Sequence, residues 1–284
     1  MSGCTVLRDK NVIKSTERPV HPVSALDDTD TQPLAHGRAR PMLQVGAWAV
    51  LAAAIAAVLA TLSTAEALRL LGLPDPGPLT IYGLPAVMAA GEVAAVVMVG
   101  SLLLAAVLVP PQPSGVLDVD GYLAVRTAGT AAVIWAGCAA LLVPLSLSDS
   151  SGQPLSVVFA DPGPFLRAVG DIEVTRAWAF TAALGAVAAV GCRITLRHKW
   201  TPALLALAIL TLMPRALSGH SASGGSHDIA TNSLALHLVA AAVWAGGLAA
   251  LVLHLRRRGG HLDVAARRFS AIALVAFVVI TVSG

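Results

Sequence analysis

Charged residues are scarce in this chain of 284 residues, making up 12% of it, whereas ordinary soluble domains contain about 25%. Hydrophobic residues make up 56%, and the charged residues cluster between long apolar runs. These runs lack the alternation over about ten residues that marks a transmembrane β-barrel. Every backbone group in lipid must be hydrogen-bonded within its own segment, so the pattern predicts an all-α, polytopic membrane bundle.

Cysteine is also rare, and its placement excludes a thiolate cluster. The three cysteines, Cys4, Cys138 and Cys192, lie far apart and form no CxxC motif, which predicts isolated thiols. The net charge of +3 gives no reason to expect nucleic acid as a partner. The chain has no nucleotide-binding loop and no fixed nucleophile–base pair, so we expect no enzymatic activity.

Residues 1–41 form a polar tail of mixed charge with four prolines, and they have too few apolar residues to bury a core. We expect this tail to be disordered and residues 42–284 to form the membrane domain. The last of about seven predicted helices has only about 16 residues before Gly284, fewer than the ~20 needed to cross a bilayer, so the domain is predicted to be incomplete at its C-terminus. The predicted helices cover about 43–63, 79–108, 121–147, 174–195, 201–217, 232–254 and 269 onward.

Lysine and arginine are distributed unevenly between the two predicted sides of the membrane. If the N-terminal tail is cytoplasmic, fifteen of the nineteen lie inside and four lie outside. Such a bias predicts a cytoplasmic N-terminus in a bacterial inner-membrane protein. The loop at about 218–231 then faces the extracytoplasmic space. His198, His254 and His261 fall at cytoplasmic helix ends beside arginines, and we expect them to be interfacial rather than metal ligands.

Three histidines within eighteen residues, His220, His227 and His237, stand in a stretch that is polar and rich in glycine and serine before it becomes apolar. Imidazole is the commonest side-chain ligand for transition metals. His237 is predicted to lie about 8 Å down a helix, on a face of small residues suited to close packing, so its ring should point into the bundle. We expect the loop to fold back and place His220 or His227 over it, forming an extracytoplasmic metal site.

Glu92 is a second unusual residue, because it falls near the middle of the second predicted helix. A carboxylate at that depth needs a cation, a proton or a strong hydrogen-bond donor. Glu92 is therefore a further candidate metal ligand, but it is equally a candidate proton carrier or a neutral acid bonded to a neighbouring helix. Met88, one turn nearer the outside, is a thioether of the kind that suits Cu(I), although isolated methionines in apolar helices usually serve packing.

Short motifs in the last quarter of the chain resemble the copper resistance D family. The residues that carry this resemblance are Ser218-Gly219-His220, Leu236-His237, Trp244-Ala245-Gly246-Gly247-Leu248, Arg268-Phe269-Ser270 and Ser283-Gly284.

This resemblance covers only residues 215–284. It implies a protein that moves or handles copper at the bacterial inner membrane, with His220 and His237 as its best ligands and His227 as a third. No methionine-rich stretch accompanies these histidines, which leaves Cu(I) and Cu(II) both open. The long N-terminal extension and the composition also resemble actinobacterial proteins in which this domain precedes a cytochrome oxidase assembly (CtaG-type) domain.

The sequence thus predicts a multi-pass copper transport or delivery protein of the bacterial plasma membrane. Its expected partners are the lipid bilayer, the copper ion, and a periplasmic copper chaperone or a cytochrome oxidase assembly partner. Two alternatives stay open: a structural or assembly subunit that binds no metal, and a haem-binding membrane protein. The second would need axial histidines on facing helices, whereas His237 and His254 lie about 25 Å apart on one predicted helix.

Overall fold

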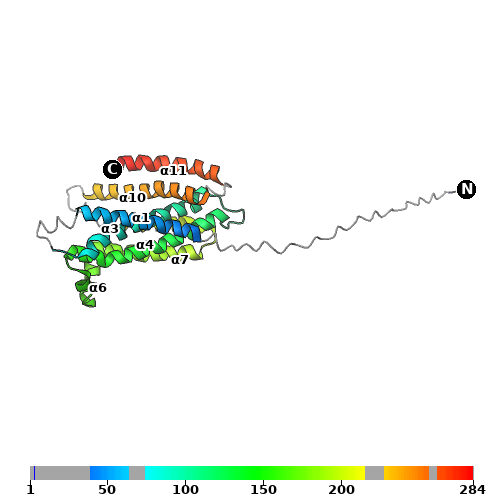
Figure 1. The fold of residues 1–284 in the computed structure, drawn as a ribbon. Helices are drawn as coiled ribbons and strands as arrows, with labels where there is room; N and C mark the ends of the chain where they lie inside the picture. Colours follow the sequence, from blue (N-terminus) through cyan, green and yellow to red (C-terminus); the bar gives the residue numbers. More distant parts are fainter. Residues whose placement is uncertain (1–2, 4–38, 64–73, 215–226, 256–260, 284) are drawn as a thin grey trace.

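The computed structural model describes residues 3, 39–63, 74–214, 227–255 and 261–283. Within these ranges the chain is helical and has no strand, which confirms the predicted all-α class. The long helices lie side by side with their axes roughly aligned, some parallel and some antiparallel, and form an elongated bundle (Figure 1). The helices are α1 (Ala39–Ser63), α3 (Pro78–Leu103), α4 (Val119–Ser151), α5 (Leu155–Val158), α6 (Pro162–Asp171), α7 (Glu173–Ile194), α8 (Thr201–Leu210), α10 (His227–Ala250) and α11 (Leu262–Ser283).

Five of these helices are long and apolar enough to cross a membrane. Many of their large apolar side chains point outward, for example Ile194 at 75% exposure and Val282 at 83%. Apolar side chains exposed on this scale are expected where lipid, rather than water, surrounds the helices. The spans are Pro78–Leu108, Val119–Ser151, Glu173–Ile194, Ser233–His254 and Leu262–Ser283, and α1 adds a shorter apolar helix at Gly46–Ala60.

Two predicted helices differ from the structure. The last one begins at Leu262 and has 22 residues, so it is long enough to cross a bilayer. Its first two turns carry Asp263, Arg267 and Arg268. Because these residues are charged, hydropathy alone assigned the first turns to a loop. α8 has only 10 residues before a turn, about 15 Å of helix against a hydrocarbon core of about 30 Å. The expected count of seven spans is therefore not confirmed.

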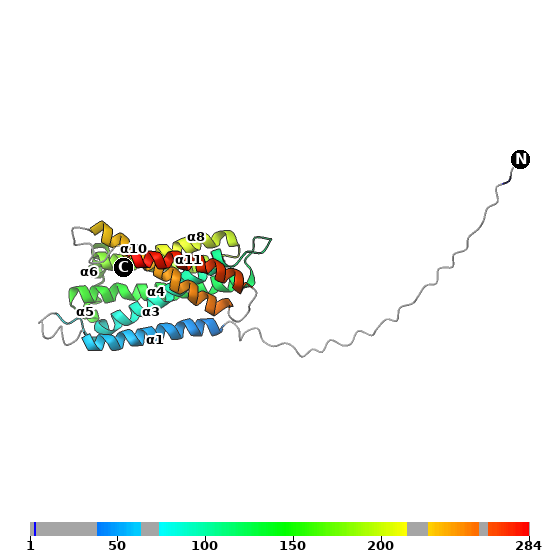
Figure 2. The same ribbon diagram turned by 90° about the horizontal axis from the view of Figure 1, so that it is seen from above.

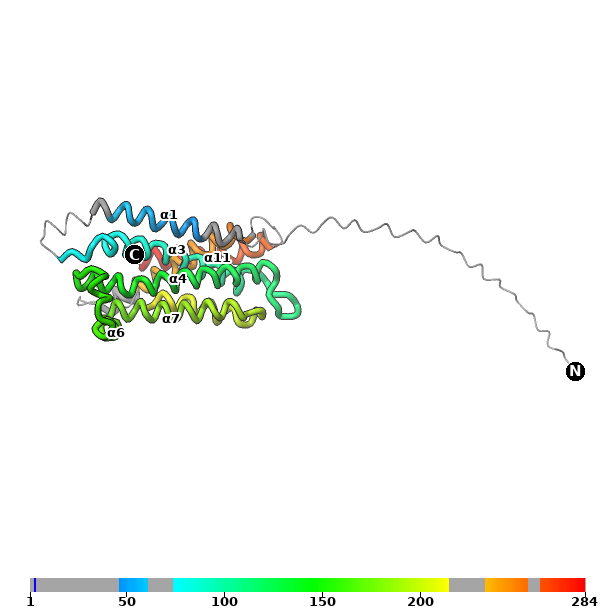
Figure 3. The backbone as a smooth tube through the Cα atoms, turned by 60° about the horizontal axis from the view of Figure 1, so that its bottom comes forward, coloured from blue at the N-terminus to red at the C-terminus, as the bar shows by residue number. Residues whose placement is uncertain are grey.

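α3 is the central helix, with 72% of its most apolar window buried, whereas α11 at 17% is peripheral. On one side, α1, α3, α4 and α7 lie next to one another in that order (Figure 3). On the other side, α10 packs between α3 and α11 (Figure 1). α3 ends in a π-helical turn, η2 (Leu104–Leu108), before Pro110 and Pro111, which cannot donate the backbone hydrogen bonds of a continuing helix.

Several polar side chains inside the bundle are paired across helices. The indole Nε1–H of Trp135 on α4 donates to Thr211 Oγ1 at 3.1 Å, just after α8. The rings of Trp135 and Trp178 on α7 meet edge to face, with centroids 6.1 Å apart. The hydroxyls of Thr80 on α3 and Ser148 on α4 lie 2.6 Å apart. Because buried polar groups need partners, these pairs fix how α3, α4, α7 and the segment after α8 face one another.

The bundle has two distinct ends (Figure 2). The His237 end is the one where α3, α7 and α10 begin and α11 finishes, and α6 projects from it (Figure 1). At the opposite, Asp118 end, α4, α8 and α11 begin. There, the two loops that flank α4 and α8 pair through Leu117 N–H, which donates to the Leu196 carbonyl at 3.1 Å. Arg126 Nη1 donates to the Arg193 backbone carbonyl at 3.4 Å, so these two arginines lie at the same end of the bundle.

Candidate metal centre

His237 lies in the third turn of α10 and is partly buried against the end of α11. Its Nδ1 is 3.3 Å from Ser283 Oγ. One turn earlier on α10, Ser233 Oγ donates to the Ser283 carbonyl at 2.6 Å. The end of α11 is thus held over the His237 ring. His220, its predicted partner, lies outside the described residues, so the structure does not place it.

We expected His227 to lie in a loop, but it is the first residue of α10. On a continuous helix, ten residues separate the backbones of His227 and His237 by about 15 Å. Nitrogen ligands of one ion each lie about 2 Å from it. The two histidines therefore do not share a coordination sphere while α10 is continuous. The side chain of His227 lies outside the described part.

Glu92 lines two hollows beside α3. The wider cavity, of about 800 Å³, is bounded by α1, α3 and α10, and its wall includes Trp48 and Trp244. The narrower one, of about 230 Å³, runs between α3 and α10 from Leu238, the residue after His237, down to Ala245 and Trp135. The Glu92 side chain is exposed to this space. The single carboxylate thus borders a hollow that begins beside the His237 turn and reaches toward mid-membrane.

Met88 and Trp244 do not join His237. Met88 is partly buried and packs against the hydrophobic core, one turn before Glu92. Trp244 is 44% exposed and lines the wide cavity facing α1. Among the described residues, the predicted candidates therefore lie in two places: His237 at the interface of α10 with α11, and Glu92 between the two cavities.

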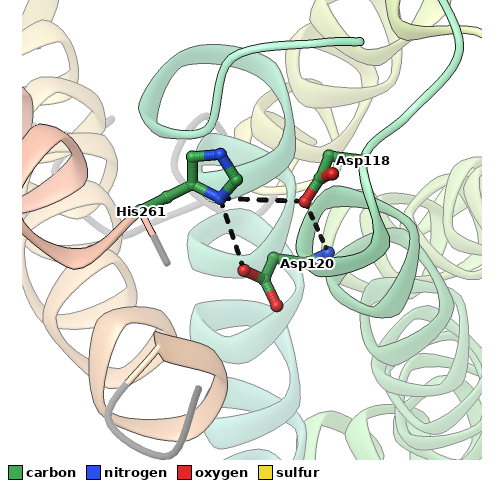
Figure 4. A group of neighbouring side chains, drawn as sticks. All are labelled: Asp118, Asp120 and His261. Atoms are coloured by element: carbon green, nitrogen blue, oxygen red, sulfur yellow. Dashed lines mark hydrogen bonds and ion pairs between the residues drawn. The ribbon is translucent and has the colours of Figure 1, made fainter. Parts of the chain in front are cut away.

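A cluster of possible metal ligands that the sequence did not predict lies at the other end of the bundle (Figure 4). Asp118 caps the N-terminus of α4, and its Oδ2 accepts from the Asp120 backbone N–H at 3.3 Å. His261 precedes α11, and its Nδ1 lies 3.7 Å from Asp118 Oδ2 and 3.5 Å from Asp120 Oδ2. We name these three residues the Asp118 cluster. His261 is therefore not merely interfacial, because two carboxylates face one of its ring nitrogens.

One signal for this cluster was present in the sequence. Asp118 and Asp120 stand two residues apart directly before a long apolar run, where one aspartate is expected as a helix cap. The second aspartate had no such explanation. Nothing in the sequence indicated that His261, more than a hundred and forty residues later, would approach the same point.

The two ends are separated by about the thickness of a membrane. Ser283, which contacts His237, lies 22 residues after His261. At 1.5 Å per residue, that length of helix is about 33 Å. Ala245, in the wall of both cavities with Glu92, is eight residues after His237, or about 12 Å along α10. Glu92 therefore lies at an intermediate depth between His237 and the Asp118 cluster.

Comparison with curated proteins finds similar chains in mycobacteria. The chain is 26% identical over 197 residues to an uncharacterized protein of Mycobacterium bovis, Mb0105, and equally to the uncharacterized protein MT0111 of Mycobacterium tuberculosis. It is 22% identical over 184 residues to the uncharacterized protein ML1998 of Mycobacterium leprae. These matches cover 68% and 65% of this chain but only 29% and 28% of the relatives, so the chain spans less than a third of their length. No solved structure matches.

A family model named "Copper resistance protein D-like, N-terminal domain" matches residues 78–229. This match runs from the start of α3 to the first turn of α10 and covers more than half of the chain. It lies mostly before residues 215–284, whose motifs carried the resemblance, so it confirms the family from a different part of the chain. The CtaG-type arrangement stays a prediction. The chain belongs to the copper resistance protein D-like family, through its N-terminal domain.

Proposed function

We propose that this protein transports copper ions, or delivers them to a partner, across the bacterial inner membrane. The family match over residues 78–229 carries this proposal, because the family is copper-related and the described part of the chain has five helices long and apolar enough to cross a membrane. His220 and His237 are proposed to capture the ion at the His237 end. The resemblance of the last quarter of the chain supports this pair, as does the position of His237 inside the apolar part of α10.

The hollow beside His237 supports a route into the bundle. It begins at Leu238 and contains Glu92, the one carboxylate among the residues that line the two cavities. An ionisable group at this depth is costly unless it is paired or serves an ion or a proton, so it is a candidate for function. We propose that Glu92 receives the copper ion after the histidines, or carries the proton that is exchanged for it.

The distribution of charge supports the orientation. Described lysines and arginines gather at the Asp118 end: Arg126, Arg193, Arg197, Lys199, Arg267 and Arg268. Under the positive-inside rule this end is cytoplasmic and the His237 end faces outward. Copper would then meet the histidines first, coming from the periplasm or a periplasmic chaperone. Delivery to cytochrome oxidase assembly remains one proposed use of the copper.

Two measurements test the proposal: the copper content of cells that express the protein, and copper bound per molecule of purified protein. We compare wild type, His220→Ala and His237→Ala, and use His198→Ala at the opposite end as the matched control. Loss of a ligand from a two-imidazole site should reduce both quantities by at least about tenfold, since even an outer-shell change costs about 10- to 100-fold in affinity. The control should behave as wild type.

Unchanged copper binding and unchanged cell copper in both variants would overturn the histidine site. If all variants, and a strain without the gene, also show normal cell copper, the protein is a structural or assembly subunit instead. An absorbance band of haem in the purified protein would favour the haem alternative.

A further inference from the structure

The two contacts that His261 makes in the Asp118 cluster are too long to be hydrogen bonds. His261 Nδ1 lies 3.5 Å and 3.7 Å from the two carboxylate oxygens, whereas N–H···O bonds measure about 2.7–3.2 Å. This nitrogen is also buried and has no hydrogen-bond partner. A single N–H can donate to only one oxygen at a time, yet both carboxylates approach the same ring nitrogen (Figure 4).

The same spacing suits ligands that surround one ion. With bond lengths of about 2.0–2.2 Å, neighbouring ligands of a tetrahedral ion lie about 3.3–3.6 Å apart. The two measured edges, 3.5 Å and 3.7 Å, lie at or just above this range, and all three ligand atoms are within 4.8 Å of one another. The ligands come from two elements, the start of α4 and the start of α11, so an ion would join the two helices.

Burial gives a second, independent observation. The Asp120 side chain is only 9% exposed, and a carboxylate removed from water needs a hydrogen-bond donor, a proton or a cation nearby. A buried carboxylate and a buried imidazole nitrogen without a hydrogen-bond partner, Nδ1 of His261, therefore face the same point.

We propose that Asp118, Asp120 and His261 form a binding site for a divalent transition-metal ion at the Asp118 end, with water in the remaining position. Two carboxylates and a neutral imidazole carry two negative charges, which one divalent ion neutralises. Oxygen and imidazole donors suit Zn²⁺, Mn²⁺ and Cu²⁺, whereas Cu(I) prefers thiolates and thioethers. Among these ions the affinity order places Cu²⁺ first.

This site lies about 33 Å from Ser283 and His237 along α11, on the other side of the apolar span. Its existence does not depend on the proposed function. The role of this site in transport does rest on the proposed function. If the protein moves copper, the Asp118 cluster is the site where the ion arrives or leaves at the cytoplasmic end.

The test uses the full chain in lipid nanodiscs, with His220→Ala and His237→Ala as background, so that binding at the His237 end is not counted. Cu²⁺ and Zn²⁺ are titrated separately against a chromophoric chelator. We expect one bound ion per chain. Asp120→Asn and His261→Ala should each weaken this binding by more than the roughly 10- to 100-fold that an outer-shell change causes. Bound Cu²⁺ should show imidazole nitrogen coupling in its electron paramagnetic resonance spectrum, and this coupling should weaken in His261→Ala.

Asp263→Asn is the matched control, since it removes an exposed carboxylate from the first turn of α11, and it should bind as the parent does. If Asp120→Asn fails to fold, His261→Ala decides the question, because His261 is 31% exposed at a helix start. Absence of a bound ion in the parent, or equal affinity in the variants, would overturn the proposal and leave the cluster as an ion pair. Either result leaves the cell-copper measurement at the His237 end unaffected.

Discussion

Gly246 of α10 lies directly against Gly100 of α3. A Cβ atom added to Gly100 would overlap the Gly246 carbonyl, and one added to Gly246 would overlap the Val96 carbonyl. The two helices therefore pack backbone to backbone at this level. Small residues allow such close approach in membranes, where association depends on van der Waals packing rather than on the hydrophobic effect. This contact fixes the position of α10, and with it His237 and the cavities that Glu92 borders.

Gly246→Val should separate α3 from α10 and destabilise the bundle. Overpacking a tight contact costs about 1–3 kcal/mol, and here the overlap is with backbone, which cannot rotate away. The melting temperature in detergent should fall, and less folded protein should be recovered from membranes. Gly137→Ala on α4 is the control, because a Cβ there meets nothing within 4 Å. Equal melting temperatures for Gly246→Val and wild type would contradict the close packing.

Trp135→Phe should destabilise the bundle modestly. The change removes the hydrogen bond to Thr211 Oγ1 while keeping an aromatic ring next to Trp178. Hydrogen bonds between membrane helices average about 0.6 kcal/mol and reach at most about 1.7 kcal/mol, so the loss should fall in this range. The free energy of unfolding, obtained by chemical denaturation, measures this loss of stability. The same substitution at Trp244, which is exposed in the wide cavity, should have a smaller effect, and the reverse order would be evidence against the structure.

Arg268→Gln should loosen the start of α11 against α3. Arg268 Nη1 donates to the Val107 carbonyl at 2.8 Å, and this carbonyl lies in η2, where the helix is ending. The bond is exposed, so its loss should cost no more than about 1.5 kcal/mol. Faster hydrogen exchange at the start of α11 should report this loosening. Arg267→Gln, which removes the same charge one residue earlier, is the control, and an equal effect there would show that only net charge matters.

The sequence was sufficient for the fold class because the scarcity of charge in long runs leaves helices as the only plausible answer in lipid. Helix boundaries were less predictable where polar residues belong to a helix. α11 carries Asp263, Arg267 and Arg268 in its first turns, and α10 begins with His227 and Asp228. In α11, the Arg268 hydrogen bond to α3 and the acid in the first turn support polar residues that a hydropathy reading assigns to a loop.

The site was less predictable than the fold, because ligand sets depend on which helices become neighbours. His237 and Glu92 could be singled out, since an ionisable group inside an apolar run is unusual by itself. The Asp118 cluster could not, because it requires the start of α4 to meet the start of α11. No local spacing shows this contact. Similarly, only the structure shows that Ser283 contacts His237.

Glu92→Gln should leave the fold intact and reduce copper transport. Glutamine has the same shape but cannot carry a charge or exchange a proton at neutral pH. A charged group that contacts an ion or a strong donor contributes about 1.5–3 kcal/mol, so uptake of copper into proteoliposomes should fall by roughly 10- to 100-fold. Glu173→Gln, an exposed acid in the first turn of α7, should transport as wild type does. A Glu92→Gln protein that melts normally and also transports normally would show that the carboxylate serves packing between helices rather than the passage of ions.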